Sequence, residues 1–457
     1  MKTDTIAAIA TSLHSAGIGI IRISGEDAME IIDKIYCSKN GTKKLSNQKS
    51  HTIHYGFIVE NDEKVDEVMV SIMKAPATYT KEDTVEINCH GGVFVMQKVL
   101  EAVLRAGARL AEPGEFTKRA FLNGRIDLSE AEAVIDVIEA KNDYALKNSL
   151  SQLSGQVLTE IRSLREKILY EIAFIESALD DPEHISLEGY SDRLKEVVLK
   201  LLQEMEFLLE NGKKGRILKE GIRTLLIGKP NAGKSSILNL LLKQERAIVT
   251  EIAGTTRDVL EEELSLGGFH LKLIDTAGIR KTENQIERIG VEKTREMLKT
   301  AELVLYVVDS SVDLDENDAE IRKLIQGKKS IALLNKQDLE GKVSLSDFKE
   351  EFTAVIPVSA KENTGMDELE NCLKKLFLTE EFVGEENVML TNIRHMDALE
   401  ESIESLKLVV KSIEDDMPED FFSIDLMNSY EVLGRIIGES VGEDLVNEIF
   451  SRFCMGK

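Results

Sequence analysis

The sequence of 457 residues contains no tryptophan, only four cysteines and only six prolines. The four cysteines form no Cys-x-x-Cys pair, so the sequence indicates neither a disulfide framework nor a zinc site. No apolar run approaches the roughly 20 residues that a membrane-spanning helix needs, and the N-terminal run Ile6–Ala10 is a poor signal peptide. We therefore expect a soluble, cytoplasmic protein with no membrane association.

Basic residues are scarce relative to acidic ones: 57 Lys and Arg stand against 82 Asp and Glu, which gives a formal net charge of −25. A chain this acidic is not a general binder of polyanions, so nucleic acid must contact a local basic patch or a second protein. The cluster of basic residues between Lys213 and Arg223 could touch RNA, but a solvated hinge is an equally good interpretation. With 42% hydrophobic residues, the chain can form about three domains of ~150 residues.

The spacing of apolar residues changes along the chain and predicts a multidomain protein. Residues 1–122 are typical of an α+β domain, with a strand at Ile18–Gly25, another around Val68–Ile72 and a helix over Val93–Ala106. Between Pro113 and Pro182 apolar residues recur at helical spacing, which predicts a set of long helices.

From Gly221 short apolar strands alternate with helices, a pattern that predicts an α/β domain with a parallel sheet and right-handed crossovers. After about residue 380 helical periodicity returns. We predict an all-α domain in two parts, 123–220 and 380–457, with the α/β domain 221–379 inserted between them. The strands expected in the inserted domain are Arg223–Gly228, Leu271–Asp275, Leu303–Asp309, Ile331–Asn335 and Val355–Ser359.

The inserted domain contains a phosphate-binding loop. Gly228–Ser235 fits G-x-x-x-x-G-K-S, directly after a predicted strand and before a predicted helix, Ser236–Lys243. Glycines there let backbone N–H groups surround phosphate oxygens, and the helix N-terminus favours negative charge. We expect Lys234 to neutralise the β- and γ-phosphates and the Ser235 hydroxyl to bind Mg²⁺. The nucleotide contacts predicted in this loop are Asn231, Ala232, Gly233, Lys234, Ser235 and Ser236.

Three other motifs follow later strand ends: Asp275–Gly278, Asn335–Asp338 and Ser359–Lys361. Asp275–Gly278 can hold Mg²⁺ through water and donate an N–H to the γ-phosphate, and Thr256 can complete the Mg²⁺ shell. In Asn335–Asp338 a carboxylate can accept from guanine N1–H and the exocyclic amine, donors that adenine lacks there. Each motif alone is typical of an ordinary turn, but their joint order predicts a guanine-nucleotide domain. The contacts predicted here are Thr256, Asp275, Thr276, Ala277, Gly278, Asn335, Lys336, Asp338, Ser359, Ala360 and Lys361.

One catalytic group is missing from the pattern. Ile279 follows Gly278 where many Ras-like GTPases place the glutamine that orients the attacking water. Glu283, Glu287 and Glu292 lie downstream, although a solvated helix carboxylate is the plainer interpretation of each. No arginine finger can be assigned, so another cation or a partner must neutralise the developing charge. We also consider Arg257, which directly follows Thr256, a candidate catalytic residue.

Long motifs spread over essentially the whole chain resemble the MnmE (TrmE) family of bacterial tRNA-modification GTPases, within the TrmE-Era-like GTPases. The motifs that carry the resemblance are Gly17–Gly25, Pro113–Arg125, Asp127–Glu132, Pro230–Ser236, Ala247–Asp258 and Phe453–Lys457. The chain departs from the family at Ser12–Ala16, where family members often have Pro-Gly-rich residues, and at Met455, where Ile is more usual. The resemblance implies an N-terminal domain that binds tetrahydrofolate and dimerises, a discontinuous helical domain and an inserted Ras-like G domain.

The resemblance also implies a mechanism and a partner. It implies a homodimer that forms a heterotetramer with the flavoprotein MnmG and adds a carboxymethylaminomethyl-type group to carbon five of the wobble uridine of certain tRNAs. The G domains would pair during the GTP cycle, with K⁺ in place of an arginine finger and Glu287 orienting the water. The one-carbon unit would come from 5,10-methylene- or 5-formyltetrahydrofolate. The residues that carry over are Asn231, Thr250, Ile252 and Thr255 for K⁺, Glu251, Ala253 and Gly254 as further GTP contacts, and Arg22, Glu86, Arg125 and Lys457 for folate.

Several alternatives stay open. Cys454 could be a nucleophile or an aid to one-carbon transfer, but packing or positioning is the favoured interpretation. His90 invites a metal site, although a turn before a helix explains it better. At the level of function, a tRNA-modifying GTPase competes with a ribosome-assembly or RNA-binding switch GTPase, and with a folate-dependent one-carbon enzyme whose G domain is merely regulatory.

Overall fold

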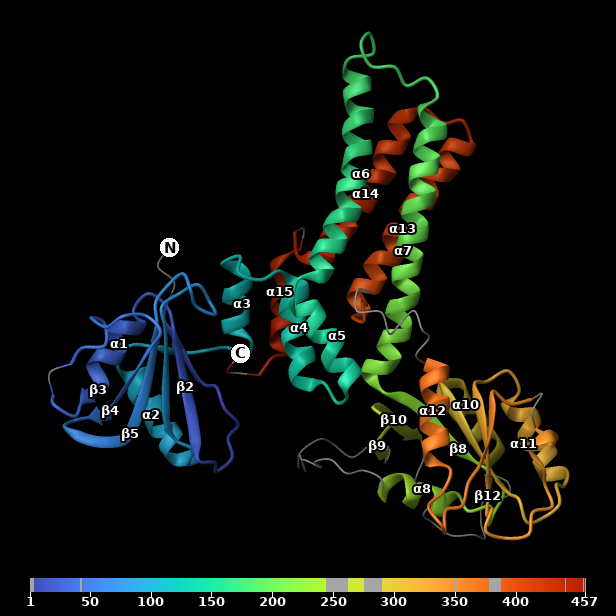
Figure 1. The fold of residues 1–457 in the computed structure, drawn as a ribbon. Helices are drawn as coiled ribbons and strands as arrows, with labels where there is room; N and C mark the ends of the chain where they lie inside the picture. The colour runs from blue at the N-terminus through green and yellow to red at the C-terminus, as the bar shows by residue number, and fades with distance from the viewer. Residues whose placement is uncertain are drawn as a thin grey trace. The chain divides into compact units, whose positions relative to one another are not determined.

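The computed structural model describes residues 4–41, 43–243, 262–274, 290–348, 351–377, 388–439, 441–454 and 456 (Figure 1). The chain divides into two compact units. The first comprises Met1–Ile138, Ser151–Leu202 and Ala398–Lys457, and the second comprises Glu139–Leu150 and Gln203–Asp397. The predicted domain boundaries after residues 122, 220 and 379 stay predictions.

The described part of the first unit contains a seven-stranded sheet in the order β3-β4-β5-β6-β2-β1-β7. All neighbouring strands are antiparallel except β1 and β7, which pair in parallel. The sequence analysis expected β2 and β5 but not β1, which had been considered only as a signal-peptide run. The strands are β1 (Ile6–Ile9), β2 (Ile18–Ser24), β3 (Tyr36–Ser38), β4 (Thr52–Glu60), β5 (Glu63–Met73), β6 (Thr84–His90) and β7 (Arg109–Leu110).

Two helices, α1 (Ala28–Ile35) and α2 (Val93–Arg105), cover one face of this sheet and form its core. Side chains alternate across a strand, so Ile21 and Ile23 point into that core while Ile18 lies on the opposite face, where it is 58% exposed. The uncovered face therefore displays side chains to a ligand or a partner.

The helical part of the first unit is built around α6 (Gln156–Asp180), which packs along α14 (Glu419–Ile437). The prediction of long helices after Pro113 is only partly right, because α3 (Glu115–Leu122) and α4 (Leu128–Glu139) are short. Gly124 and Gly155 have φ of 65° and 82°, a left-handed conformation that interrupts helices and that glycine adopts without strain. The helix α15 (Glu443–Ser451) also belongs to this unit, α5 (Asp143–Leu153) lies mostly in the second unit, and α7 (Tyr190–Glu220) and α13 (Ile393–Glu414) contain residues of both units.

The second unit contains a six-stranded sheet in the order β13-β12-β11-β8-β10-β9, parallel except for the β9–β10 pair. Alternate residues of β11 enter two cores: Leu303 and Val307 pack with α8 and α12, whereas Val304 and Tyr306 pack with α10 and α11. This is the α/β pattern that the sequence predicted. The elements are β8 (Ile222–Ile227), α8 (Lys234–Lys243), β9 (Glu262–Leu266), β10 (Phe269–Ile274), α10 (Gly290–Thr300), β11 (Leu303–Asp309), α11 (Glu316–Ile325), β12 (Ser330–Asn335), the 3-10 helix η1 (Leu345–Asp347), β13 (Ala354–Pro357) and α12 (Met366–Phe377).

Candidate functional sites

The glycine-rich loop lies between β8 and α8, at the carboxyl end of a central parallel strand, where open α/β sheets bind ligands. Asn231 and Gly233 have φ of 61° and 96°, so the loop alternates conformations and turns successive backbone N–H groups toward one side. A side chain at Gly228 would meet Val307 O at 2.3 Å, and one at Gly233 would meet Asn335 Nδ2 at 2.1 Å. Both glycines are therefore required by close packing.

Lys234 begins α8 with its side chain folded back over the loop. Its Nζ donates to the carbonyl oxygens of Gly228 and Lys229, each at 2.7 Å. Burial lowers the pKa of Lys234, so its charge is held in a poorly solvated place where an anion would bind strongly. Ser235 and Ser236 are exposed on the first turn of α8, where the hydroxyl of Ser235 suits Mg²⁺, which prefers oxygen ligands.

The predicted base-binding edge is held together by Asn335, the last residue of β12. Its Nδ2 donates to Ala232 O at 2.9 Å, and its Oδ1 accepts from Ala360 N–H at 3.2 Å. The side chain is buried, and it ties the glycine-rich loop to the segment after β13. Lys336 follows with φ of 66° and pairs with Asp309, a residue that the sequence analysis did not single out.

Asp338 lies beside Ser359 and Lys361. Ser359 Oγ donates to Asp338 Oδ1 at 2.9 Å, and Lys361 Nζ lies 3.4 Å from Oδ2. The serine hydrogen bond, together with Lys361, holds the pKa of Asp338 below its ordinary value, so the group is a carboxylate at neutral pH. The structure thus places a charged double acceptor at the edge where the sequence predicted guanine recognition.

Other predicted residues lie outside the described residues. This holds for the predicted water-orienting Glu287, for Arg257, and for Lys457 of the predicted folate site. It holds equally for the predicted Mg²⁺ and K⁺ ligands other than Ser235 and Asn231. The predicted nucleotide contacts in this class are Thr250, Glu251, Ile252, Ala253, Gly254, Thr255, Thr256, Asp275, Thr276, Ala277 and Gly278.

Three of the four predicted folate residues, Arg22, Glu86 and Arg125, gather at the sheet face that α1 and α2 leave uncovered. Arg22 of β2 and Glu86 of β6 are cross-strand partners, and Arg22 Nε donates to Glu86 Oε1 at 2.9 Å. Arg22 Nη1 also donates to Gly456 O at 3.0 Å, so the end of the chain reaches this face. The guanidinium of Arg125 lies 4.7 Å from the ring centroid of Tyr79, and that of Arg22 lies 5.8 Å from it. Tyr79 and Gly456 thus join the predicted set, and no periodicity in the sequence pointed to either.

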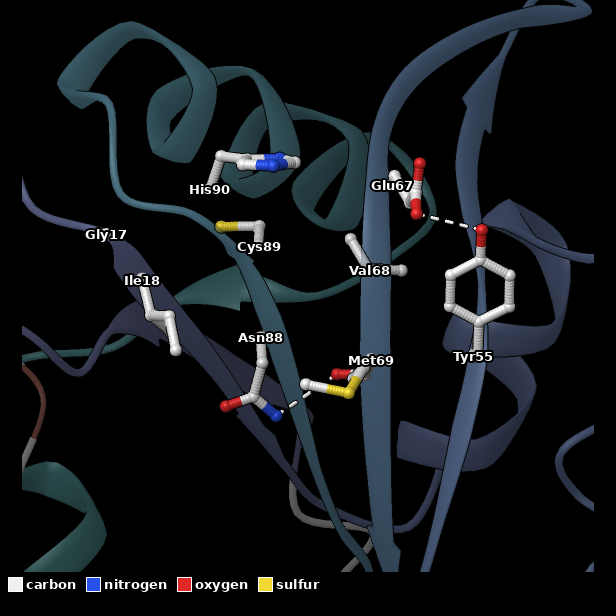
Figure 2. A pocket seen from close by; sticks show the side chains of 9 residues that line it. All are labelled: Gly17, Ile18, Tyr55, Glu67, Val68, Met69, Asn88, Cys89 and His90. Atoms are coloured by element: carbon white, nitrogen blue, oxygen red, sulfur yellow. Dashed lines mark hydrogen bonds between the residues drawn. The ribbon is translucent and has the colours of Figure 1, made fainter.

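A cavity of about 250 Å³ opens on the same sheet (Figure 2). Its walls are largely apolar, with exposed Ile18, Met69 and Tyr55. None of the predicted site residues lines it. The lining residues are Gly17, Ile18, Tyr55, Glu67, Val68, Met69, Asn88, Cys89 and His90.

His90 and Cys454 need correction. His90 is the last residue of β6 rather than part of a turn, and its Nδ1 pairs with Asp66 Oδ1 at 2.7 Å. Within the described residues no group of three potential ligands could hold a metal ion. Cys454 is exposed, so packing of its thiol is the wrong interpretation. Its backbone carbonyl accepts from Gly114 N–H at 3.3 Å. A positioning role and a role of the thiol in one-carbon transfer both stay predictions.

Comparison with known proteins identifies the family of the chain. Family models described as the MnmE helical domain and the GTP-binding protein TrmE N-terminus match residues 128–454 and 5–125. The chain belongs to the MnmE/TrmE family. The tRNA modification GTPase MnmE of Lachnoclostridium phytofermentans is 56% identical over 100% of both chains. That of Enterococcus faecalis is 47% identical over 100% of this chain and 99% of its own, and that of Bacillus subtilis is 46% identical over 99% and 100%.

Membership of the MnmE/TrmE family settles the class of enzyme. The protein is a GTP hydrolase that acts in tRNA modification, with a TrmE-type N-terminal domain and a helical domain. Among the described helices, none is long and apolar enough to cross a membrane.

Proposed function

We propose that this protein acts as a homodimer with a flavoprotein of the MnmG type and uses a tetrahydrofolate one-carbon unit. Together they would add a carboxymethylaminomethyl-type group to carbon five of the wobble uridine of certain tRNAs. The observation that carries the proposal is the convergence of Arg22, Glu86 and the Gly456 carbonyl on the uncovered sheet face. A GTPase that only switches ribosome assembly has no use for such a site.

The residues at this face suit a folate in its chemistry. Both Arg22 contacts use Glu86 Oε1, so the ion pair does not occupy Oε2, which can accept from the amide-like donors of a pterin. Arg22, Arg125 and Lys457 supply cations for the carboxylates of the glutamate tail. Two of these three, Arg22 and Arg125, lie against Tyr79, which gives the ring system a flat apolar contact.

The uncovered face also supports the homodimer. Ile18, Ile53, Tyr55 and Met69 are 58%, 68%, 48% and 50% exposed, an unusual set of large apolar side chains for the surface of one domain. Apolar patches of this kind mark protein interfaces. A second copy seated there would bring its own site close to the same face.

For hydrolysis, we propose that Asn231 supplies an amide oxygen to K⁺ beside the phosphates, with Thr250, Ile252 and Thr255. A fixed cation there would stabilise the charge that develops during phosphoryl transfer, as an arginine finger does. Glu287 would orient the attacking water, Ser235 and Thr256 would bind Mg²⁺, and Arg257 would assist in the same loop. Pairing of the G domains in the presence of GTP and K⁺ would activate hydrolysis, and hydrolysis would drive motion through the helical domain rather than form the product.

Steady-state GTP hydrolysis in KCl against matched NaCl tests the cation. We expect at least about tenfold faster turnover in K⁺, equivalent to about 1.4 kcal/mol of activation free energy. Asn231→Gly should abolish the difference, and this variant keeps the backbone at φ 61° without strain because glycine tolerates it. Equal rates in both salts for the wild type would exclude K⁺ as the activating cation and favour an arginine finger supplied by a partner.

Mass spectrometry of tRNA nucleosides tests the reaction. Wild type, flavoprotein, tetrahydrofolate donor and GTP should together yield the modified wobble uridine, and Arg22→Met should lower the yield while GTP hydrolysis continues. Modification in the absence of GTP turnover would favour a folate enzyme with a regulatory G domain. No modification under any condition would favour the assembly-switch function.

A further inference from the structure

The side chain of Lys229, the second residue of the glycine-rich loop, extends to the start of α11. Its Nζ lies 2.6 Å from Asp318 Oδ2 and 3.0 Å from Asp315 Oδ2. The lysine side chain is 15% exposed and that of Asp318 is 2% exposed, so this ion pair is largely removed from solvent. Breaking such a pair leaves an uncompensated buried charge, which is costly.

The acceptor at the other end is fixed by its own hydrogen bonds. Tyr306 Oη donates to Asp318 Oδ1 at 2.7 Å, and the backbone N–H of Asp315 donates to Asp318 Oδ2 at 2.9 Å. Tyr306 is fully buried and stacks on Phe352 at 5.7 Å. Asp315 also caps α11, accepting from the N–H groups of Asn317 and Asp318. The start of α11 is therefore a rigid anchor.

Charge at this contact persists at neutral pH. Burial acts to lower the pKa of Lys229, but hydrogen bonds to Asp318 and Asp315 outweigh it and leave the pKa above its ordinary value. The hydrogen bond from Lys229 holds the pKa of Asp315 below its ordinary value. The contact is an ion pair and not a neutral hydrogen bond.

The backbone of Lys229 belongs to the phosphate-binding loop. Its carbonyl oxygen accepts from Lys234 Nζ at 2.7 Å and from Ala232 N–H at 3.3 Å. Lys229 thus contacts two parts of the domain. Its side chain pairs with aspartates at the start of α11, and its carbonyl oxygen lies within the phosphate-binding loop. A movement of Asp318 and Asp315, which hold the Lys229 side chain, would therefore displace the Lys229 carbonyl oxygen that accepts from Lys234 Nζ.

We infer that Lys229 is a positioning residue for the guanine nucleotide, which fastens the glycine-rich loop to Asp318 and Asp315 and thereby places Lys234 and the loop N–H groups for the phosphates. The inference rests on the proposed nucleotide site. It adds to that site a residue that acts indirectly, by positioning the loop that binds the phosphates. Lys229 itself does not touch the nucleotide.

Fluorescent mant-GDP binding to the full chain, by titration and by stopped-flow dissociation, tests the inference. Lys229→Met should raise the Kd about tenfold through faster dissociation, and should raise KM for GTP far more than it lowers kcat, because the reacting groups are unchanged. Lys229→Arg keeps the charge and should stay within about twofold of wild type. Lys342→Met is the control: it breaks a lysine–aspartate pair that is exposed rather than buried, with Asp313 at 3.1 Å.

A double-mutant cycle shows whether Lys229 acts through α11. Adding Asp318→Asn to Lys229→Met should weaken mant-GDP binding no further than the stronger single change. Where Asp318→Asn fails to fold, Tyr306→Phe takes its place in the cycle. Wild-type binding by Lys229→Met, equal losses in Lys229→Met and Lys342→Met, failure of Lys229→Arg to rescue, or full additivity in the cycle would each overturn the inference. Absence of mant-GDP binding by the wild type would instead overturn the nucleotide site itself.

Discussion

At the scale of single residues, the nucleotide site depends on side chains that join two loops. Asn335 bonds to Ala232 on one side and Ala360 on the other, while Ser359 donates to Asp338. The base edge and the phosphate loop are thus set by one hydrogen-bond network. Because a buried polar group without its partner is costly, such networks specify one geometry.

Replacing Asp338 by asparagine should change which base is accepted. In the predicted site the carboxylate would accept from two guanine donors, whereas an amide would place its NH₂ against one of them and its oxygen against the other. We expect the affinity for GTP to fall at least about 100-fold and the affinity for xanthosine triphosphate, which has an oxygen in place of the exocyclic amine, to rise. Competition of the two nucleotides against mant-GDP measures this. Glu362→Gln, at an exposed neighbour, is the control, and an unchanged preference for GTP would exclude Asp338 from the base site.

The sequence predicted these residues by type and place but not their contacts. Gly-x-x-x-x-Gly-Lys-Ser and Asn-Lys-Gln-Asp are local patterns, so they identify Lys234, Asn335 and Asp338 without a structure. The bond from Asn335 to Ala232 joins residues 103 positions apart, and Lys229 to Asp318 is likewise non-local. Nothing in local periodicity records which acceptor a side chain reaches across the fold.

At the scale of elements, buried parallel strands were the most predictable part. The predicted Leu303–Asp309 is β11 residue for residue, because seven consecutive buried positions bounded by polar turns have few other interpretations. The four-residue β1 was not predicted, since so short an apolar run carries little periodicity. The segment after Pro113 was predicted as long helices because amphipathic spacing continues across Gly124 and Gly155, where the chain turns.

The start of α3 is fastened by ion pairs that should make stability depend on pH. Glu115 Oε1 lies 2.6 Å from Arg109 and 3.0 Å from Arg119. Burial acts to raise the pKa of Glu115, but hydrogen bonds from Arg109, the Glu112 N–H and Arg119 outweigh it and leave the pKa below its ordinary value. A depressed pKa contributes stability above the unfolded-state value of about 4.3, and this contribution is lost as pH falls through the folded-state pKa.

Glu115→Gln should therefore lower the melting temperature at pH 7, with a loss of about 1–2 kcal/mol, the cost typical of a lost charged hydrogen bond. The difference from wild type should begin to shrink as pH falls below the unfolded-state value of about 4.3, and it should continue to shrink until pH falls through the lower folded-state pKa. Thermal unfolding from pH 3.5 to pH 8 measures both. Glu448→Gln, in an exposed pair with Arg452, should leave the melting temperature unchanged. A deficit for Glu115→Gln that is equal at every pH would show that packing, not charge, holds α3.

At the scale of the whole molecule, a residue near the end of the chain contacts a predicted folate-binding residue of the N-terminal sheet. Gly456 donates no side chain, but its carbonyl accepts from Arg22, 434 positions away. A terminal lysine in a folate site was expected only from the family resemblance, since contacts between chain ends leave no local pattern. The structure places Gly456, the residue before Lys457, against Ile9 and Ala10 and in contact with Arg22, as that expectation requires.

Gly456→Ala should prevent this closure, because a Cβ there would lie 2.6 Å from Ala10 Cα and 2.6 Å from Ile9 O, both backbone atoms. We expect the affinity for 5-formyltetrahydrofolate, measured by equilibrium titration, to fall about tenfold, and the C-terminus to be released faster by carboxypeptidase. GTP hydrolysis should be unchanged. Gly442→Ala, which adds a methyl group where nothing lies within 4 Å, is the control for a glycine substitution near the same terminus. Wild-type folate affinity in Gly456→Ala would show that the end of the chain does not contribute to folate binding. Loss of GTP hydrolysis would show that the C-terminal segment also affects the nucleotide site.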